Sequence, residues 1–172
     1  CLAGLYRLEY CYDLASTVEM GTMIREKLMS SSISRFPQEG EADVLETTTV
    51  KDRLFILYQI EQNETFKRQG IYEFQRGMFG GYRFRQSSSE AYPLVITSLT
   101  EIGRQQYLKI YTANWPEEAA RFAVFSGYHT PYFEGDPVPD PSTLTPVYEG
   151  TAAKSILQVI PVTEEQVKAG FY

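Results

Sequence analysis

The sequence predicts an α+β domain: a long N-terminal helix packed on a curved antiparallel sheet of about six or seven strands, with a short C-terminal helix. Two observations predict this class. Apolar residues recur at three- and four-residue steps near the N-terminus, and they alternate with a period of two from Ala42 onward. The chain has 172 residues, 43% of them hydrophobic and 22% charged, which suits a single domain over 1–172 with a sizeable core.

Residues 2 to about 30 are expected to be helical. Apolar side chains recur there at helical spacing, from Leu5 to Leu28. The apolar stripe drifts along the segment, which indicates a break near Asp13, a residue that can cap a second helical piece. A loop that contains Pro37 then ends the helical part of the chain.

Beyond Ala42 the chain is expected to form β-strands. The first two are "DVLETTTV", which is rich in β-branched residues, and "RLFILYQIEQ", whose first half is expected to be buried on both faces. The next stretch is "FKRQGIYEFQRGMFGGYRFRQ", residues 66–86. Its alternating side chains on either side of "RGMFGG" predict a hairpin with one buried face, because glycine accepts the positive φ that a turn needs.

Two further strands, "PLVITSLTE" and "RQQYLKIYTA", follow a serine-rich loop. The segment 119–126 allows two interpretations. Pro116 followed by two glutamates favours the start of a helix, whereas alternation around Phe122 and Val124 favours a strand. We prefer a strand that pairs with 105–112.

The last third of the chain begins with an irregular segment. "HTPYFEGDPVPDPSTLTP" is rich in proline and cannot form a central strand. "KSILQVIPV" is expected to be the last strand. "TEEQVKAG" is expected to be a short helix, because Thr163 and Gln166 form a capping-box pair and Gly170 stands where a C-cap belongs.

The charge of the chain argues against nucleic acid as a partner. The formal net charge is −6, and most of the excess acidic residues lie in the last third. A chain with this balance repels a phosphate backbone unless its bases are gathered in one place.

The two cysteines, Cys1 and Cys11, bear on location rather than on metal binding. They form no CxxC motif and no Cys/His cluster, so we expect no zinc site. A first residue Cys is typical of a bacterial lipoprotein, in which it carries the lipid. The alternatives are a trimmed membrane anchor and a chain that begins there for other reasons. Residues 1–12 are therefore a possible anchor-proximal segment, and no stretch of about 20 apolar residues provides a membrane span.

Three stretches, "FILYQIEQN", "GIYEFQRGMFGGYRF" and "YLKIYTANW", resemble a strand-turn-strand pattern of small extracytoplasmic lipoproteins and membrane-anchored proteins of Gram-positive bacteria. The resemblance covers less than half of the chain. It implies an extracytoplasmic domain, tethered to the membrane through its N-terminus. It implies no catalytic residues.

Catalytic chemistry is not expected. His129 is the only histidine, and no triad, zinc-protease, phosphate-loop or dinucleotide motif occurs. Carboxylates that are grouped in the sequence are interpreted as helix-start, turn and loop charges rather than as glycosidase or calcium sites: Glu117, Glu118, Glu134, Asp136, Asp140, Glu164 and Glu165. We therefore expect no enzyme activity, no metal and no cofactor.

The candidate anion-binding residues are Arg68, Arg76, Tyr82, Arg83 and Arg85. Bases interleaved with aromatic side chains could bind an envelope polyanion such as a teichoic acid, or lipid headgroups. The solvated face of a strand carries the same residue types, so that interpretation stays open.

The predicted function is that of a non-catalytic domain tethered to the cell envelope, acting through contacts with an envelope protein or an anionic polymer. In that case the helix–sheet interface should be filled. The alternative is a small-ligand-binding domain, with a pocket between helix and sheet lined by Tyr and Phe. It predicts a cavity of about 300 Å³ or more, lined with convergent polar groups. The sequence does not predict an oligomeric state.

Overall fold

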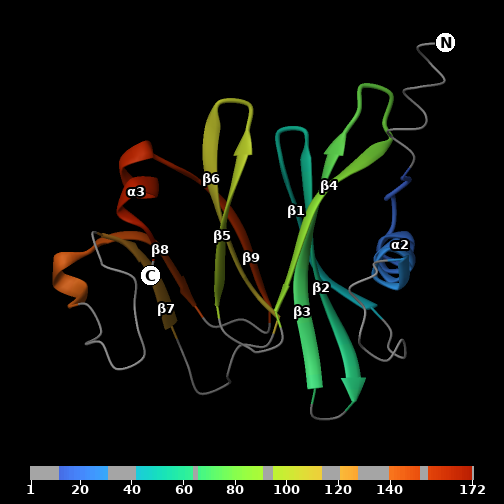
Figure 1. The fold of residues 1–172 in the computed structure, drawn as a ribbon, viewed down its shortest axis with the longest axis horizontal. Coiled ribbons are helices and arrows are strands. Elements are labelled where there is room, and N and C mark those ends of the chain that lie inside the picture. The colour runs from blue at the N-terminus through green and yellow to red at the C-terminus, as the bar shows by residue number, and fades with distance from the viewer. Residues whose placement is uncertain are drawn as a thin grey trace.

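The computed structural model describes residues 12–30, 42–63, 66–90, 95–113, 121–127, 140–151 and 155–171. Within these ranges the chain forms nine strands in three antiparallel sheets, with two short α-helices (Figure 1). The predicted α+β class was wrong. The fold is mostly β, the strands are divided among three sheets, and no long N-terminal helix is present in the described residues.

The first sheet has four strands in sequence order, β1 (Ala42–Val50), β2 (Arg53–Asn63), β3 (Phe66–Arg76) and β4 (Tyr82–Glu90). The second sheet has the order β5 (Ile96–Ile102), β6 (Gln105–Thr112) and β9 (Ile156–Val162). The third sheet pairs β7 (Arg121–Ser126) with β8 (Thr145–Thr151). The helices are α2 (Thr17–Ser30) and α3 (Glu164–Ala169), and a 3-10 turn covers Pro141–Thr143.

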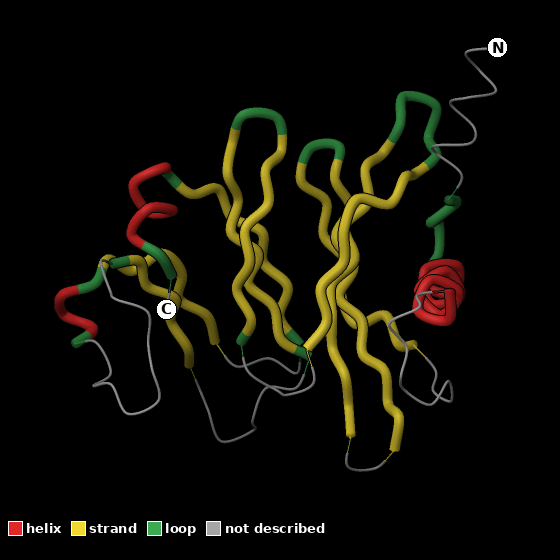
Figure 2. Tube along the Cα trace, viewed as in Figure 1, coloured by secondary structure: helices red, strands yellow, loops and turns green. Residues whose placement is uncertain are grey.

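The three sheets are stacked as layers, with a helix at each end of the stack (Figures 1 and 2). Helix α2 lies beside the first sheet, and the third sheet and α3 lie on the far side of the second sheet. Three clusters of buried hydrophobic residues fill the three interfaces between these layers. The hydrophobic core therefore consists of three separate layers of side chains, one in each interface. A chain with many strands and little helix buries its apolar surface in this way.

The helix predicted from residue 2 to about 30 is seen only from Thr17 onward. Before it, Tyr12 forms a β-bridge with Tyr82, and the two backbone N···O distances are 3.1 and 3.0 Å. An extended Tyr12 cannot continue a helix, and the described chain is not helical before Thr17, whereas a break between two helical pieces stays a prediction. Residues 1–11 lie outside the described residues.

The cap of α2 is Ser16 rather than the predicted Asp13. The Ser16 amide donates to the Glu19 carboxylate at 2.8 Å, and the Glu19 amide donates to Ser16 Oγ at 3.2 Å. This reciprocal pair is a capping box, and it satisfies two amides that the helix leaves without partners. The start of α2 is thus set by a local serine–glutamate pair.

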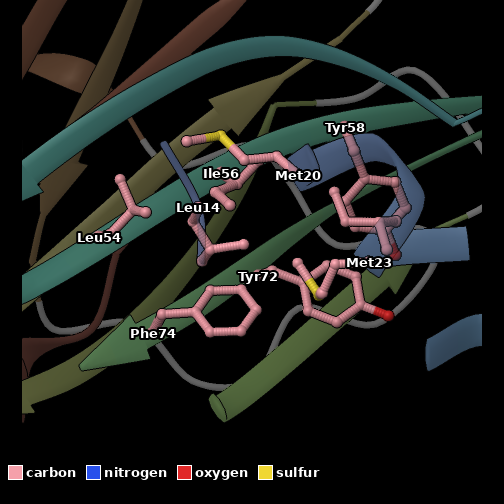
Figure 3. Packing of buried hydrophobic residues seen from close by; sticks show 9 residues of the cluster. Leu14, Met20, Met23, Leu54, Ile56, Tyr58, Tyr72 and Phe74 are labelled. Atoms are coloured by element: carbon pink, nitrogen blue, oxygen red, sulfur yellow. The ribbon is translucent and has the colours of Figure 1, made fainter. Parts of the chain in front are cut away.

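The interface between α2 and strands β2 and β3 of the first sheet is filled. Figure 3 shows side chains from the helix and its approach packed against β2 and β3. The nine buried residues of this cluster are Leu14, Met20, Met23, Ile24, Leu54, Ile56, Tyr58, Tyr72 and Phe74. Ile24, Ile56 and Phe74 are completely inaccessible to solvent.

The phenol of Tyr72 gives this interface a testable pH dependence. Burial raises the pKa of Tyr72 from 10.0 to about 12, and the nearby Tyr12 adds to the increase. Because the folded-state pKa is the higher one, the neutral phenol contributes stability that is complete below pH 10 and is lost as the pH rises through 12. We expect the free energy of unfolding to fall more steeply from pH 10 to 12 in the native chain than in Tyr72→Phe. Urea unfolding at several pH values measures both slopes, and equal slopes would contradict the prediction.

The strands β2 and β6 are buried on both faces. Every residue from Leu54 to Tyr58 is buried, which confirms the two-sided burial predicted for the first half of that strand. Every residue from Tyr107 to Thr112 is also buried. Both strands lie in sheets that are covered on each side, which explains the continuous apolar run of β2, whereas β6 also buries Lys109 and Thr112.

The segment 119–126 contains a strand, β7, but the predicted pairing with 105–112 was wrong. β7 pairs with β8, from Arg121 opposite Thr151 to Ser126 opposite Thr145. Strand β6 has no free edge for it, because β5 and β9 occupy both of its sides. The strand β8 was not predicted, since its start overlaps the proline-rich segment. Pro146 is tolerated there because each strand of a two-stranded sheet has an outer edge.

Two local predictions are confirmed. Residues 66–86 form the hairpin of β3 and β4, with Gln75 opposite Arg83, but the predicted single buried face was wrong, because every residue from Gln69 to Phe74 is buried. The C-terminal helix is α3, and Thr163 and Gln166 make the predicted capping box. Both depend on residues that are neighbours in the sequence.

Candidate functional site

The β3–β4 turn projects an apolar tip from the molecule. The Gly77 amide donates to the Gly81 carbonyl at 2.8 Å, and the Gly80 amide donates to the Gly77 carbonyl at 3.2 Å. Gly80 has a φ of 98°, which favours glycine at this point of the turn. Between these glycines, Met78 and Phe79 are 90% and 81% exposed.

The β1–β2 turn lies against the start of this hairpin. The Arg76 amide donates to the Asp52 carbonyl at 2.7 Å, and the Gln75 side-chain amide donates to the Asp52 carboxylate at 2.6 Å. The exposed Lys51 places its Nζ 5.5 Å from the ring centroid of Tyr107 on β6, within the range of a cation–π contact. This turn therefore connects the first and second sheets.

The β5–β6 turn lies at the same end of the stack (Figure 1). Gly103 has a φ of 69°, and Arg104 beside it is exposed. Turns of three hairpins thus share one end of the molecule: residues 51–52, 77–81 and 103–104. We call this end the hairpin end.

The hairpin end carries more exposed base than acid. Its exposed bases are Lys51, Arg76 and Arg104, and its acids are Asp52 and Glu101. The negative charge of Asp52 is partly compensated, because its carboxylate lies 3.8 Å from Arg53 Nε. A base-rich end on a chain with net charge −6 is a local departure from the overall charge.

The structure brings together only some of the predicted anion-binding residues. Arg76 and Tyr82 face each other at the base of the β3–β4 turn, and Arg83 pairs with Gln75 one position further. Arg85 is exposed on β4, next to an irregularity in the pairing with β3. Arg68 is apart, since eight residues of extended strand place it about 26 Å from Arg76.

The two faces of the hairpin also separate the predicted residues. Arg83 lies on the face toward the second sheet, where its guanidinium donates two hydrogen bonds to Gln75 Oε1 at 2.9 and 3.2 Å. Arg76 and Tyr82 lie on the opposite face, in register with Phe74. The candidate anion site therefore centres on the turn, and Lys51 and Arg104 join it from neighbouring hairpins.

A buried polar cluster around Glu73 joins the first two sheets. The Glu73 carboxylate is 2% exposed and lies 2.9 Å from Arg53 Nη1 and 3.8 Å from Lys109 Nζ. It also accepts hydrogen bonds from Thr100 at 2.9 Å and from Gln86 at 2.6 Å. With both oxygens engaged and two cations beside it, this carboxylate holds the sheets together and is not placed to take a proton from a substrate.

Lys109 is the most unusual titratable group in this cluster. Desolvation lowers the pKa of its ammonium group from 10.5, and the nearby Glu73 carboxylate opposes that decrease. A lysine amine that is 3% exposed between two sheets lacks the access that a nucleophile needs. Lys109 therefore has a structural role and not a catalytic one.

A groove of about 430 Å³ lies between α2 and β1. Its described lining is aliphatic, polar or charged, and consists of Thr17, Val18, Gly21, Thr22, Arg25, Ala42, Asp43 and Val44. The predicted ligand pocket was aromatic-lined and between helix and sheet, but the aromatic residues there, Tyr58, Tyr72 and Phe74, are packed in the core.

The other residues considered from the sequence are only partly described. Asp140 accepts a hydrogen bond from the Ser142 amide at 2.9 Å, and this bond lowers the pKa of its carboxyl group. Glu164 and Glu165 lie in the first turn of α3, as expected for helix-start charges. Seven further residues lie outside the described residues: Cys1, Cys11, Glu117, Glu118, His129 and the loop acids Glu134 and Asp136.

Two further features of the described ranges concern metal binding and membrane spans. No group of three or more His, Cys, Asp or Glu side chains there could hold a metal ion. Neither helix in those ranges combines the length and apolar character that a membrane span requires.

Comparisons with protein-family models, with curated proteins and with solved structures gave no match for this chain. The resemblance to Gram-positive lipoproteins therefore stays a prediction. The features that define a class of protein here are structural ones: stacked antiparallel sheets, filled interfaces and a base-rich end made of turns.

Proposed function

We propose that this chain is a non-catalytic domain, tethered to the cell envelope outside the cytoplasm, that acts through contacts at its hairpin end. Exposed bases favour an anionic polymer over a protein as the partner. The observation that carries the proposal is the gathering of Lys51, Arg76 and Arg104 from three separate hairpins at one end.

The interior supports a binding role at the surface. The buried charges Arg53, Glu73 and Lys109 neutralise one another inside the stack. Between α2 and the first sheet, the aromatic residues Tyr58, Tyr72 and Phe74 are members of a buried cluster. The exposed bases at the hairpin end are not part of this buried cluster, although Lys51 also lies over the ring of Tyr107. A polyanion is the partner that their charge suits.

The polymer contact predicts a charge-specific loss of binding. We expect Lys51→Gln/Arg76→Gln/Arg104→Gln to bind a soluble teichoic acid at least about tenfold more weakly than the native chain, because each base near an anionic surface contributes about 1 kcal/mol. Fluorescence anisotropy with labelled polymer measures the affinity, which should also fall as salt is added.

A matched control removes exposed bases from other layers. Arg25→Gln/Arg121→Gln takes one base from α2 and one from β7, both exposed. Its affinity should stay within about twofold of the native chain, since those bases lie outside the hairpin end. An equal loss in both variants would mean that net charge alone governs binding, and the assigned surface would be wrong.

The tether has its own test. Mass spectrometry of the N-terminal peptide from native cells should find a diacylglyceryl group on Cys1. An unmodified Cys1 would contradict lipid attachment and leave the polymer contact to be judged on the binding data.

A further inference from the structure

The tip of the β3–β4 hairpin has an apolar character that its turn does not require. The glycines supply the turn geometry, whereas tight turns favour polar residues at the positions between them. Met78 and Phe79 are the two most exposed large hydrophobic residues among the described ones, ahead of Val18 at 76% and Leu99 at 39%. They are also adjacent, so they form one apolar point.

Exposed bases lie at the same end of the molecule as this apolar point. Arg76 precedes it on β3, and Lys51 and Arg104 lie on the neighbouring turns of the hairpin end. An apolar tip with a basic rim has the composition that binds the interface of an anionic bilayer, where apolar side chains enter the boundary and bases meet the headgroups. A soluble polyanion has no apolar region in which an apolar side chain could be buried. Met78 and Phe79 therefore favour a bilayer as the partner of this tip.

The tip is held in a fixed shape. Its turn is closed by the Gly77–Gly81 hydrogen bond, and β3 and β4 are paired from Arg76 opposite Tyr82 onward. Such a tip loses little conformational freedom when it binds, which preserves affinity.

A second membrane contact would strengthen the proposed tether. One acyl chain alone gives only marginal, reversible membrane binding, and the apolar tip would add to it.

We infer that Met78 and Phe79 enter the headgroup region of an anionic lipid bilayer, so that the hairpin end rests on the membrane. The inference rests on the proposed function, because it names the surface that the tethered domain meets. Binding should need both the apolar tip and the basic rim.

The test uses the purified, unlipidated chain and vesicles of phosphatidylcholine with or without phosphatidylglycerol, separated by sedimentation. The native chain should bind the anionic vesicles at least about tenfold more tightly than the neutral ones. Met78→Ser and Phe79→Ser should each weaken binding to anionic vesicles by about tenfold, because each removes an apolar side chain from the interface. The control Val18→Ser removes an equally exposed apolar side chain from α2 and should bind as the native chain does.

A spectroscopic readout accompanies the sedimentation. The fluorescence of Phe79→Trp should shift to shorter wavelength on addition of anionic vesicles, whereas the native chain with its single Trp should show no such shift. Native-like vesicle binding by Phe79→Ser, or no binding by the native chain, would overturn the inference.

The teichoic acid assay separates this inference from the proposed function. Met78→Ser and Phe79→Ser should bind the soluble polymer with unchanged affinity. If the native chain binds polymer but not vesicles, the membrane contact alone is wrong. If it binds neither, the polymer contact fails with it.

Discussion

Replacing Glu73 with Leu is expected to lower the free energy of unfolding by about 3–5 kcal/mol, because it leaves buried cations without their carboxylate. Lys109 would lose its ion pair, and Arg53 would keep only Asp52, at 3.8 Å. Thr100 and Gln86 would each lose an acceptor. Urea denaturation at neutral pH measures the loss.

Two controls separate the buried cluster from an effect of losing any glutamate. Glu149→Leu changes an exposed strand residue on β8 and should cost no more than about 0.5 kcal/mol. The double variant Glu73→Leu/Lys109→Met should recover part of the stability, because it also removes the unpaired cation. If Glu73→Leu were as mild as Glu149→Leu, the cluster would not be holding the sheets together.

Truncation of Phe55 to Ala is expected to cost about 3–5 kcal/mol, since it removes a large apolar side chain and leaves a cavity. Phe55 is completely inaccessible and belongs to the cluster between the first and second sheets, with Leu57, Ile71 and Tyr111 among its members. Thermal and urea unfolding should both detect the loss, as long as unfolding is two-state.

The matched control is Phe79→Ala at the hairpin tip. Phe79 is 81% exposed, so its truncation should change stability by no more than about 0.5 kcal/mol. Similar losses for Phe55→Ala and Phe79→Ala would show that the two sheets do not pack face to face as described. A small effect at Phe79 would also support a surface role for that side chain.

Features that depend on neighbouring residues were predictable from the sequence. The β3–β4 hairpin follows from alternation around "RGMFGG", and α3 follows from its capping-box pair. The spacing of apolar residues predicted a first helix that included Tyr12. The structure pairs Tyr12 with Tyr82 instead, and local spacing cannot show a partner so distant in the sequence.

The division into three sheets was not predictable from alternation. Strands such as β2 and β6 are buried on both faces, and a continuous apolar run does not show which sheet covers which face. The alternating side chains of β7 correctly predicted a strand. Its partner could not be predicted, because β9 occupies the edge of β6 where β7 was expected to pair. Polar residues at alternating positions, such as Glu73 and Lys109, look like a solvated face until two sheets meet.

The candidate site was only partly predictable for the same reason. Arg76, Tyr82, Arg83 and Arg85 belong to one hairpin, so sequence grouping found them together. Lys51 and Arg104 are single bases in separate turns, and only the stacking of the sheets brings them to the same end. The sequence offered one indication of their role: both Lys51 and Arg104 lie in turns next to predicted strands.

One measurement tests the location of the binding surface most directly. Amide chemical shifts of the ¹⁵N-labelled chain, followed during titration with soluble teichoic acid, map the surface that meets an anionic partner. The account predicts that the changes concentrate at residues 51–52, 77–81 and 103–104. Changes concentrated along the groove between α2 and β1, or no changes at all, would contradict it.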